Sequence, residues 1–345
     1  MPIHHDPKFT LTTADRFFCI GSCFARNVEE HLIYRGVDVL SRSILSPKIE
    51  SVARHNGHVN KFTTLSMLNE IAWQLNPPEV GPDDFEEKDA GWVDLQLVPG
   101  VPPVPLQRAI DRRRYLVTDY FARVREATVV VVTLGLNEVW KDNEKGIYLN
   151  AAPSYVSVRG KPERFSLHIT DVAENVEALE ALRHALLRLN PALRLIVSVS
   201  PVPLANSFSG RDILVANTLS KAVLVAAART LCDRHDDTDY FPSFEMVSLA
   251  PHARAFAADR KHVADSVVRG VIGRFLDLYM GLPDEEIAFR EMAYLAANPD
   301  VDAAVRLCQF SSGFEHWTKR GKAEGRPLVP VEGPTAAMIA VGLAN

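Results

Sequence analysis

Three groups of residues in this sequence could together carry out nucleophilic catalysis. The first is Ser22, in the segment CIGSCFA at residues 19–25, where a predicted strand ends and a predicted helix begins. The free N–H groups and the positive dipole end of a helix N-terminus favour a developing oxyanion, so a serine at that point is a candidate nucleophile. The alternative interpretation is that Ser22 only caps the helix, which is a common use of serine.

The other two groups are Asn137 and the pair formed by Asp259 and His262. Asn137 follows the predicted strand at residues 127–134, and its amide could donate into the same cleft as Ser22. A turn asparagine that satisfies local backbone groups is the alternative. Asp259 stands three residues before His262, so its carboxylate can bond the imidazole Nδ1–H and leave Nε2 free to take the serine proton. Together the three groups indicate a nucleophile, a base and an oxyanion donor.

Cys23 is a second candidate nucleophile, because a helix N-terminus lowers the pKa of a thiol. Adjacent side chains at a strand-to-helix turn point in different directions, so we expect Cys23 to support the turn while Ser22 reacts. A thiol-dependent enzyme remains the alternative at this point.

The sequence predicts no cofactor and no metal. The segment GSCFA lacks the second and third glycines of the dinucleotide-binding pattern GxGxxG, and no phosphate-binding GKS or GKT follows it. His55 and His58 have a spacing that could bind a metal, but no third ligand is evident. The four cysteines form no CxxC pair, so a structural zinc site has no support.

The elements that must position these residues alternate between strand and helix patterns. Strands are predicted at residues 16–20, 36–40, 127–134, 194–199 and 240–247, and helices at 24–35, 64–75, 171–189, 211–234 and 263–280. The apolar runs of the strands are continuous, which is typical of strands buried on both faces. We therefore predict an α/β fold with a central parallel sheet and helices on both faces.

The chain divides into a main domain at residues 1–282 and a small helical module with a tail at residues 283–345. The main domain contains an insertion loop at about residues 77–115, which is rich in proline. An arginine cluster in it predicts a solvated helix face, with anion binding as the alternative; its members are Arg108, Arg112, Arg113 and Arg114.

Composition excludes several classes of function. The 345 residues carry 38 Lys and Arg against 43 Asp and Glu, a formal charge of 38 − 43 = −5, so nucleic acid is not expected as a partner. The sequence contains no run of about 18 apolar residues, so we do not expect an integral membrane segment. The N-terminus lacks the basic start and apolar core of a secretory signal, so we expect a cytoplasmic protein.

Several blocks of the sequence resemble the GSCFA-domain family, whose name is the pentapeptide at residues 21–25. The segments NKFTT at 60–64, TLGLNEVW at 133–140 and SPVPL at 200–204 also resemble blocks of that family, and the likeness covers about residues 10–280. The family is similar in layout to the SGNH/GDSL hydrolases. The resemblance implies a three-layer α/β/α, flavodoxin-like fold with a central parallel sheet, to which this chain adds the small helical C-terminal appendage.

The resemblance also assigns roles to residues. It implies a triad of Ser22, His262 and Asp259, with Asn137 and the Ser22 backbone N–H as oxyanion donors. Gly57 and Asn60 fall in the block that supplies a further oxyanion or substrate-binding group. Glu138 departs from the family-like pattern, which has Asp after the asparagine.

The function implied by the resemblance is that of a serine ester hydrolase or an O-acyltransferase. The partner that the resemblance implies is a small-molecule or glycan ester, with an acetyl or other acyl ester of a carbohydrate or surface polysaccharide as the expected substrate. A C-terminal pattern that includes NPDV at 298–301 and HW at 316–317 resembles a module found near polysaccharide systems, with a packing role as the alternative. A catalytically inactive binding or scaffold protein of the same fold is the second hypothesis for the whole chain.

Overall fold

The structure is a computed structural model, which describes residues 3–42, 57–251, 255–256, 263–281, 289–307, 309–310 and 312–329. The chain divides into two compact units. Unit 1 comprises Met1–Ser43 and Glu50–Glu285, and unit 2 comprises Ile44–Ile49 and Glu286–Asn345. Each unit is described by itself.

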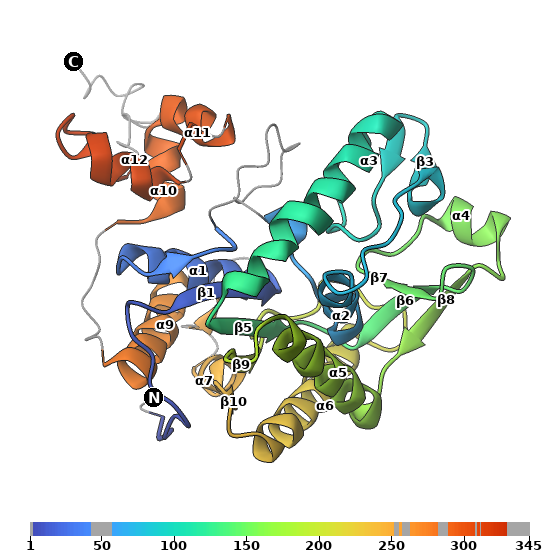
Figure 1. The fold of residues 1–345 in the computed structure, drawn as a ribbon, viewed down its shortest axis with the longest axis horizontal. Coiled ribbons are helices and arrows are strands. Elements are labelled where there is room, and N and C mark those ends of the chain that lie inside the picture. Colours follow the sequence, from blue (N-terminus) through green and yellow to red (C-terminus); the bar gives the residue numbers. More distant parts are fainter. Residues whose placement is uncertain are drawn as a thin grey trace, which may run out of the picture. The chain divides into compact units, whose positions relative to one another are not determined.

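A parallel sheet forms the centre of unit 1 (Figure 1). Its five strands in the described part of the chain are β1 (Arg16–Gly21), β2 (Asp38–Val39), β5 (Val129–Leu134), β9 (Arg194–Val199) and β10 (Thr238–Tyr240). They lie in the order β10-β9-β5-β1-β2, and every neighbouring pair is parallel. This is the flavodoxin-like strand order, which reverses between β1 and β5 and places a ligand crevice at the carboxyl ends of the strands there. The predicted α/β fold is confirmed.

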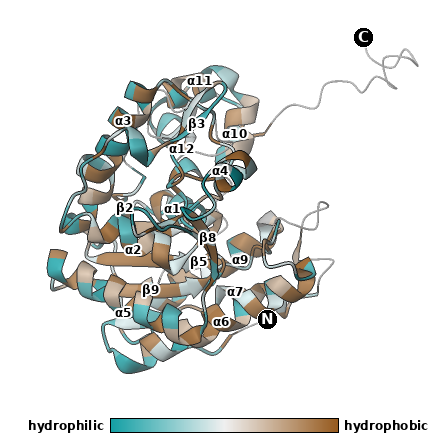
Figure 2. Cartoon of the chain, turned by 90° about the vertical axis from the view of Figure 1, so that its right-hand side faces the viewer, coloured by the Kyte–Doolittle hydropathy of each residue, from teal (hydrophilic) through white to brown (hydrophobic). Residues whose placement is uncertain are grey.

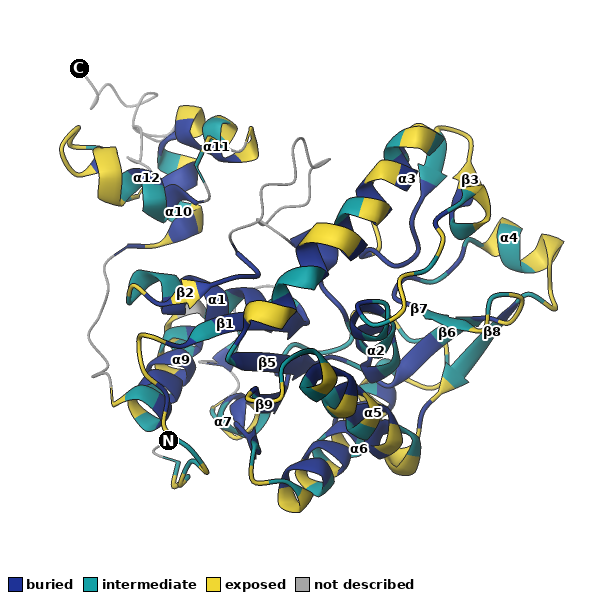
Figure 3. Cartoon of the chain, in the orientation of Figure 1, coloured by how far each residue is buried: buried dark blue, intermediate teal, exposed yellow. Residues whose placement is uncertain are grey.

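Both faces of the sheet are buried, as the continuous apolar runs predict. On one face, alternate residues such as Phe17, Val129 and Ile196 share a core cluster with helices α1 (Cys23–Tyr34) and α9 (Asp265–Met280). The strands are among the most hydrophobic and most deeply buried parts of the unit (Figures 2 and 3).

The opposite face is covered by α5 (Val172–Leu189) and α6 (Ile213–Arg234), with α2 (Thr64–Ala72) packed on α5. Asp171 and Glu174 form the capping box expected from their spacing at the start of α5. By length and composition alone α6 could span a membrane, since an 18-residue stretch of it has a mean hydropathy of 1.3. Because α6 packs against α5 and β9, its apolar content is also that of a helix covering a sheet.

The predicted insertion is folded rather than a surface loop. It contains a hairpin of β3 (Glu86–Lys88) and β4 (Gly91–Val93), followed by α3 (Leu106–Tyr115). The prediction of a solvated arginine face is wrong for Arg112 and Arg113, which are 3% and 4% exposed because α3 packs them against the body of unit 1. A second sheet follows β5 and joins three antiparallel strands in the described chain: β6 (Glu138–Asp142), β7 (Ile147–Leu149) and β8 (Phe165–Ile169).

The last predicted strand, at residues 240–247, is mostly wrong. β10 ends at Tyr240, and Ser243–Ser248 form helix α7, since Pro242 interrupts the strand pattern. The remaining short helices are η1 (Gly57–Val59), η2 (Pro82–Asp84), η3 (Leu116–Tyr120), η4 (Phe121–Glu126) and α4 (Tyr155–Gly160).

Unit 2 is helical in its described part, with α10 (Glu291–Ala297), α11 (Pro299–Arg306), α12 (Gly313–His316) and η5 (Trp317–Gly321). Residues of its sequence pattern hold this small core together. The Asn298 amide donates to the carbonyls of Tyr294 and Pro327, and the Tyr294 hydroxyl bonds His316 Nδ1 at 2.9 Å. A Cβ at Gly321 would lie 2.2 Å from the Tyr294 hydroxyl. These contacts correspond to the packing alternative for the pattern.

Candidate functional site

Ser22 is the residue that links β1 to α1. Its Oγ accepts a hydrogen bond from the Phe24 N–H at 3.3 Å, so Ser22 is the N-cap of α1. The same oxygen lies 3.2 Å from Thr133 Oγ1, on the neighbouring strand β5. Ser22 is 3% exposed, and the positive end of the α1 dipole lies at this point. A buried serine hydroxyl therefore lies at the carboxyl edge of the sheet, at the reversal of strand order.

Close backbone contacts fix this position. Gly21 has φ +143°, and a Cβ there would lie 2.3 Å from the Thr133 carbonyl oxygen. Only glycine fits such a conformation and such a contact without a shift. A Cβ at Gly135 would likewise lie 2.8 Å from the Phe62 carbonyl oxygen. The two glycines let the segment around Phe62 lie against the ends of β1 and β5.

The segment NKFTT, residues 60–64, lies directly beside Ser22. The Lys61 N–H donates to the Gly21 carbonyl at 2.8 Å, and the N–H groups of Gly135 and Leu136 both donate to the Phe62 carbonyl at 2.9 Å. These backbone contacts place a second block of the family resemblance against the GSCFA turn.

A cavity of about 710 Å³ opens at Ser22. Its floor includes residues at the ends of three strands: Ser22, Cys23, Gly135, Leu136 and Ser200. Its walls come from the insertion, from the second sheet and from the loop after β9, including Pro99, Val101, Pro102, Pro103, Val139, Trp140, Leu149, Ala152, Val202, Leu204 and Phe208. The chemical groups of the GSCFA turn thus meet a largely apolar chamber.

Glu138 holds one wall of this cavity. Its carboxylate accepts hydrogen bonds from the Ser207 hydroxyl at 2.5 Å and from the Phe208 N–H at 2.8 Å, while Glu138 itself is 8% exposed. The Phe208 ring packs edge-on against Trp140, with centroids 5.6 Å apart. The departure from Asp to Glu in the sequence therefore coincides with a carboxylate that anchors the loop after β9.

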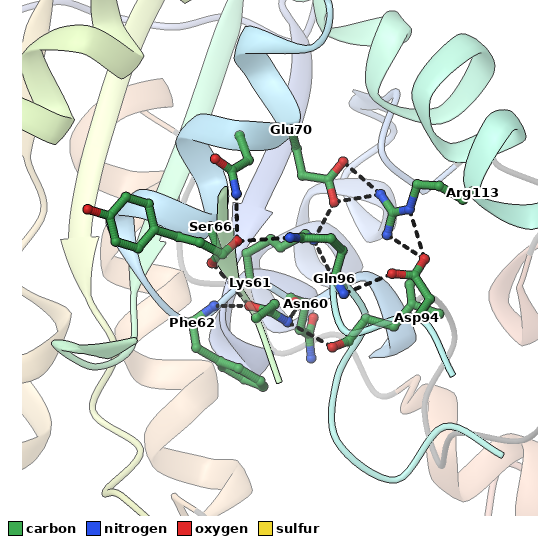
Figure 4. Close-up of polar contacts among 12 residues, drawn as sticks. Asn60, Lys61, Phe62, Ser66, Glu70, Asp94, Gln96 and Arg113 are labelled. Carbon is green, nitrogen blue, oxygen red and sulfur yellow. Dashed lines mark hydrogen bonds and ion pairs between the residues drawn. The ribbon is translucent and has the colours of Figure 1, made fainter. Parts of the chain in front are cut away.

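A buried network of charged side chains includes Lys61 of the segment at residues 60–64 (Figure 4). Glu70 accepts from Lys61 Nζ and, through both carboxylate oxygens, from Arg113 Nη1 at 2.9 and 3.0 Å. Arg113 Nε also donates to Asp94 at 2.8 Å. Burial lowers the pKa of Lys61, while the neighbouring Glu70 carboxylate opposes that shift. The pKa of Arg113 is raised, because the Asp94 and Glu70 carboxylates outweigh its burial.

Helix α6 fixes the turn after β5. Lys221 Nζ donates to the Gly135 carbonyl at 2.6 Å, and the Ser220 hydroxyl accepts from the Asn137 N–H at 3.0 Å. Lys221 is 2% exposed, and burial lowers the pKa of its ammonium to about 7.

The predicted oxyanion donors have other partners in the structure. The Ser22 N–H donates to the Thr133 carbonyl at 3.1 Å and extends the β1–β5 pairing by one residue, so this expected oxyanion donor is hydrogen-bonded within the protein. Asn137 Nδ2 donates to the Thr170 carbonyl at 2.8 Å, as in the turn-asparagine alternative. Gly57 and Asn60 are buried, and neither they nor Asn137 line the cavity. An oxyanion role for these three residues stays a prediction.

The predicted base and its orienting carboxylate, His262 and Asp259, lie outside the described residues, as does His55. His58 is described, and burial together with nearby cations, above all Arg112, lowers its pKa to about 3. Among the residues that the structure describes, no three His, Cys, Asp or Glu side chains come together as metal ligands.

Sequence reasoning missed Asn150, which lines the cavity and is 8% exposed. Its Nδ2 donates to the Asn60 carbonyl at 2.9 Å, and its Oδ1 accepts from the Phe62 N–H at 3.0 Å. Asn150 thereby ties the end of β7 to the block beside Ser22. Only its place after a short apolar run could have indicated it.

The chain is similar to known proteins in sequence and in structure. A sequence model described as "GSCFA family" matches residues 16–275. Among solved structures, the chain is similar to a Clostridium thermocellum family 3 carbohydrate esterase at 9% sequence identity, with a TM-score of 0.29, over 76% of this chain and 94% of that chain. A search of curated proteins gave no match. The family match runs from β1 into α9 and so includes both Ser22 and the Asp259–His262 motif.

Proposed function

The chain belongs to the GSCFA family, and we propose that it is a serine ester hydrolase or O-acyltransferase with Ser22 as its nucleophile. The observation that carries this proposal is the position of Ser22, a buried hydroxyl at a helix N-terminus that opens on a cavity of about 710 Å³. Oxygen nucleophiles that attack carbonyl groups need an electrostatically favourable, water-poor place of this kind.

The proposed reaction uses His262 and Asp259 as the base and its orienting group. His262 takes the proton from Ser22 Oγ, which attacks the ester carbonyl, while Asp259 keeps the imidazole in the required tautomer. The alcohol leaves with the proton from His262, and the acyl group remains on Ser22. Water then releases the acid, or an acceptor hydroxyl takes the acyl group.

We further propose that the alcohol part of the ester is a carbohydrate or a surface polysaccharide. This part of the proposal is supported by the sequence resemblance alone. The choice between hydrolysis and transfer depends on which hydroxyl reaches the acyl-enzyme.

The test is covalent labelling with a fluorophosphonate, read by mass spectrometry of the labelled peptide, beside turnover of aryl esters. Ser22→Ala is expected to abolish labelling and to lower kcat/KM by about 10³-fold or more. Because that change also removes a helix cap, Ser154→Ala is the matched control: Ser154 caps α4 through the Ser157 N–H and lies outside the lining of the cavity. It is expected to keep full labelling.

Two outcomes would contradict the proposal. Labelling that survives Ser22→Ala and is lost in Cys23→Ala would identify the thiol, which also lines the cavity. The absence of labelling and of turnover in the folded wild-type protein would favour a binding or scaffold protein of this fold.

A further inference from the structure

The cavity at Ser22 is far larger than an acetyl group requires. Its volume of about 710 Å³ is within the range of about 300–1,000 Å³ that proteins use for ligands with many non-hydrogen atoms. An acetyl group is only a methyl on a carbonyl and would leave most of this space to water. Water is held poorly where the walls offer few polar partners.

Polar side chains are a minority of the walls: Lys88, Glu138, Asn150, Asn206 and the indole of Trp140. The Asn150 amide is already bonded to the Asn60 carbonyl and the Phe62 N–H. Pro99, Pro102 and Pro103 have no backbone N–H to donate, and the neighbouring wall residues Val101, Val202 and Leu204 are aliphatic. A sugar ring in this space would leave many hydroxyl groups without hydrogen bonds, which is costly. A hydrocarbon chain has no hydrogen-bonding groups and therefore carries no such cost.

The two charged residues among the lining residues that the structure describes are Lys88 and Glu138. Lys88 forms an ion pair with Glu86 at 3.4 Å and is 41% exposed along its side chain. The Glu138 carboxylate is used by Ser207 and Phe208. Each charged side chain therefore has a partner within the protein, so neither one indicates that the cavity binds a charged ligand.

The polar hydroxyl and thiol groups lie at one end of the cavity. Ser22, Cys23 and Ser200 follow the ends of β1 and β9, whereas the prolines and most of the aliphatic residues come from the insertion, the second sheet and the loops. A carbonyl at Ser22 Oγ can therefore continue directly into a hydrocarbon chain against the apolar walls.

From these observations we infer that the cavity binds the acyl chain of the substrate, and that this chain is a medium or long hydrocarbon rather than acetyl. The inference rests on the proposed function, because it takes the ester carbonyl to lie at Ser22. It places the alcohol part of the ester outside this chamber.

The experiment is a pair of ester series. In the first, p-nitrophenyl esters vary the acyl chain from acetate to dodecanoate; in the second, acetates vary the alkyl chain of the alcohol. We expect kcat/KM to rise about fourfold per methylene in the first series until the chamber is filled, with a much smaller change in the second.

A cavity-filling variant provides a second measurement. Ala152→Phe adds a ring to the lining and should move the optimum to shorter acyl chains. The matched control is Ala181→Phe, which adds the same ring at an exposed position of α5 and should leave the chain-length profile of the wild type. A fluorescent fatty acid should bind the Ser22→Ala variant, and it should bind the Ala152→Phe variant more weakly than it binds Ser22→Ala.

The outcomes separate this inference from the proposed function. Preference for acetate, with turnover that depends on Ser22, would overturn the inference and leave the proposed function standing. A steeper dependence on the alcohol chain would show that the chamber binds the other half of the ester. Fatty-acid binding that is sensitive to Ala152→Phe, without Ser22-dependent turnover or labelling, would support the chamber and refute the proposed function. Neither binding nor turnover would overturn both.

Discussion

Glu70→Gln tests whether the buried charge network stabilises the fold around the block beside Ser22. Four charged residues of the network are at most 4% exposed: Lys61, Glu70, Asp94 and Arg113. Their formal charges sum to zero, and Glu70→Gln leaves one uncompensated positive charge in the interior. Gln also turns an amide donor toward two cations, because Glu70 accepts from both Lys61 and Arg113.

Breaking a buried ion pair on one side costs about 3–5 kcal/mol of the free energy of unfolding. With a shift of about 2–4 °C per kcal/mol for a unit of this size, the melting temperature should fall by about 6–20 °C. Urea unfolding followed by tryptophan fluorescence is a suitable assay, since the Arg113 guanidinium lies 5.9 Å from the Trp73 ring. Glu177→Gln, at an exposed position of α5, is the matched control and should change little.

The decisive variant adds a second change. In Lys61→Met/Glu70→Gln one buried positive and one buried negative charge are removed together, so the remaining Arg113 and Asp94 balance each other. We expect the double variant to be more stable than Glu70→Gln alone, against simple additivity. The reasoning is refuted if Glu70→Gln costs less than about 1 kcal/mol, or if the double variant loses the sum of both single changes.

The pH dependence of Glu70→Gln gives a further check. Burial already lowers the pKa of Lys61 below its usual 10.5, so the unfolded chain binds more protons between the folded value and 10.5. Stability therefore rises with pH in that window. Without Glu70 the folded pKa falls further and the window widens downward. The deficit of the variant against the wild type should shrink as pH rises toward the folded pKa of Lys61 in the wild type.

Three other predictions concern the turn, the helix behind it and the cavity wall. Gly21→Ala should cost about 1–3 kcal/mol in urea unfolding and slow fluorophosphonate labelling of Ser22, because its Cβ would meet the Thr133 carbonyl at 2.3 Å; wild-type labelling would contradict this. The folded pKa of Lys221 is about 7, whereas the unfolded chain keeps that proton up to about 10.5, so the free energy of unfolding should rise with pH above 7. Lys221→Met should lower the slope of this rise by about 1.4 kcal/mol per pH unit. Lys161→Met, at an exposed position, should keep the wild-type slope. Glu138→Asp withdraws the carboxylate from Ser207 and Phe208 and should loosen this wall by about 1–3 kcal/mol, seen as faster limited proteolysis near Phe208; an unchanged cleavage rate would exclude the anchoring role.

The sheet was predictable because its strands are buried on both faces. The run of valines and threonine at residues 129–133 has no alternation, and only a doubly covered strand tolerates that pattern. The junction at Ser22 was predictable for a related reason, since a glycine and a serine between a strand and a helix serve as turn and cap. The short strands β6, β7 and β8 were not found, because three to five residues carry too little periodicity to separate a strand from a loop.

Residues whose state depends on distant partners could not be assigned from the sequence. Arg113 looks like one member of an exposed arginine run, and it is buried only because Glu70 and Asp94, from two other segments, meet it there. Asn137 has the sequence context of an oxyanion donor, and that context does not reveal the hydrogen bond from its amide to the Thr170 carbonyl. In both cases the local pattern is compatible with several partners, and only the tertiary contacts show which are present.

The proposed nucleophile belongs to the predictable sheet, whereas the residues that would select the substrate lie in insertions and loops. The proposed nucleophile, Ser22, stands at a strand end, where strand order and helix dipole make its position a consequence of the fold. The groups that would select an ester are the prolines near residue 100, Ala152 and the loop held by Glu138, all outside the central sheet. Insertions and loops vary readily while the sheet that carries them is retained, so relatives with the same turn can accept different acyl groups. Exchanging the proline-rich wall should therefore change the chain-length optimum of a GSCFA protein and leave the identity of its nucleophile unchanged.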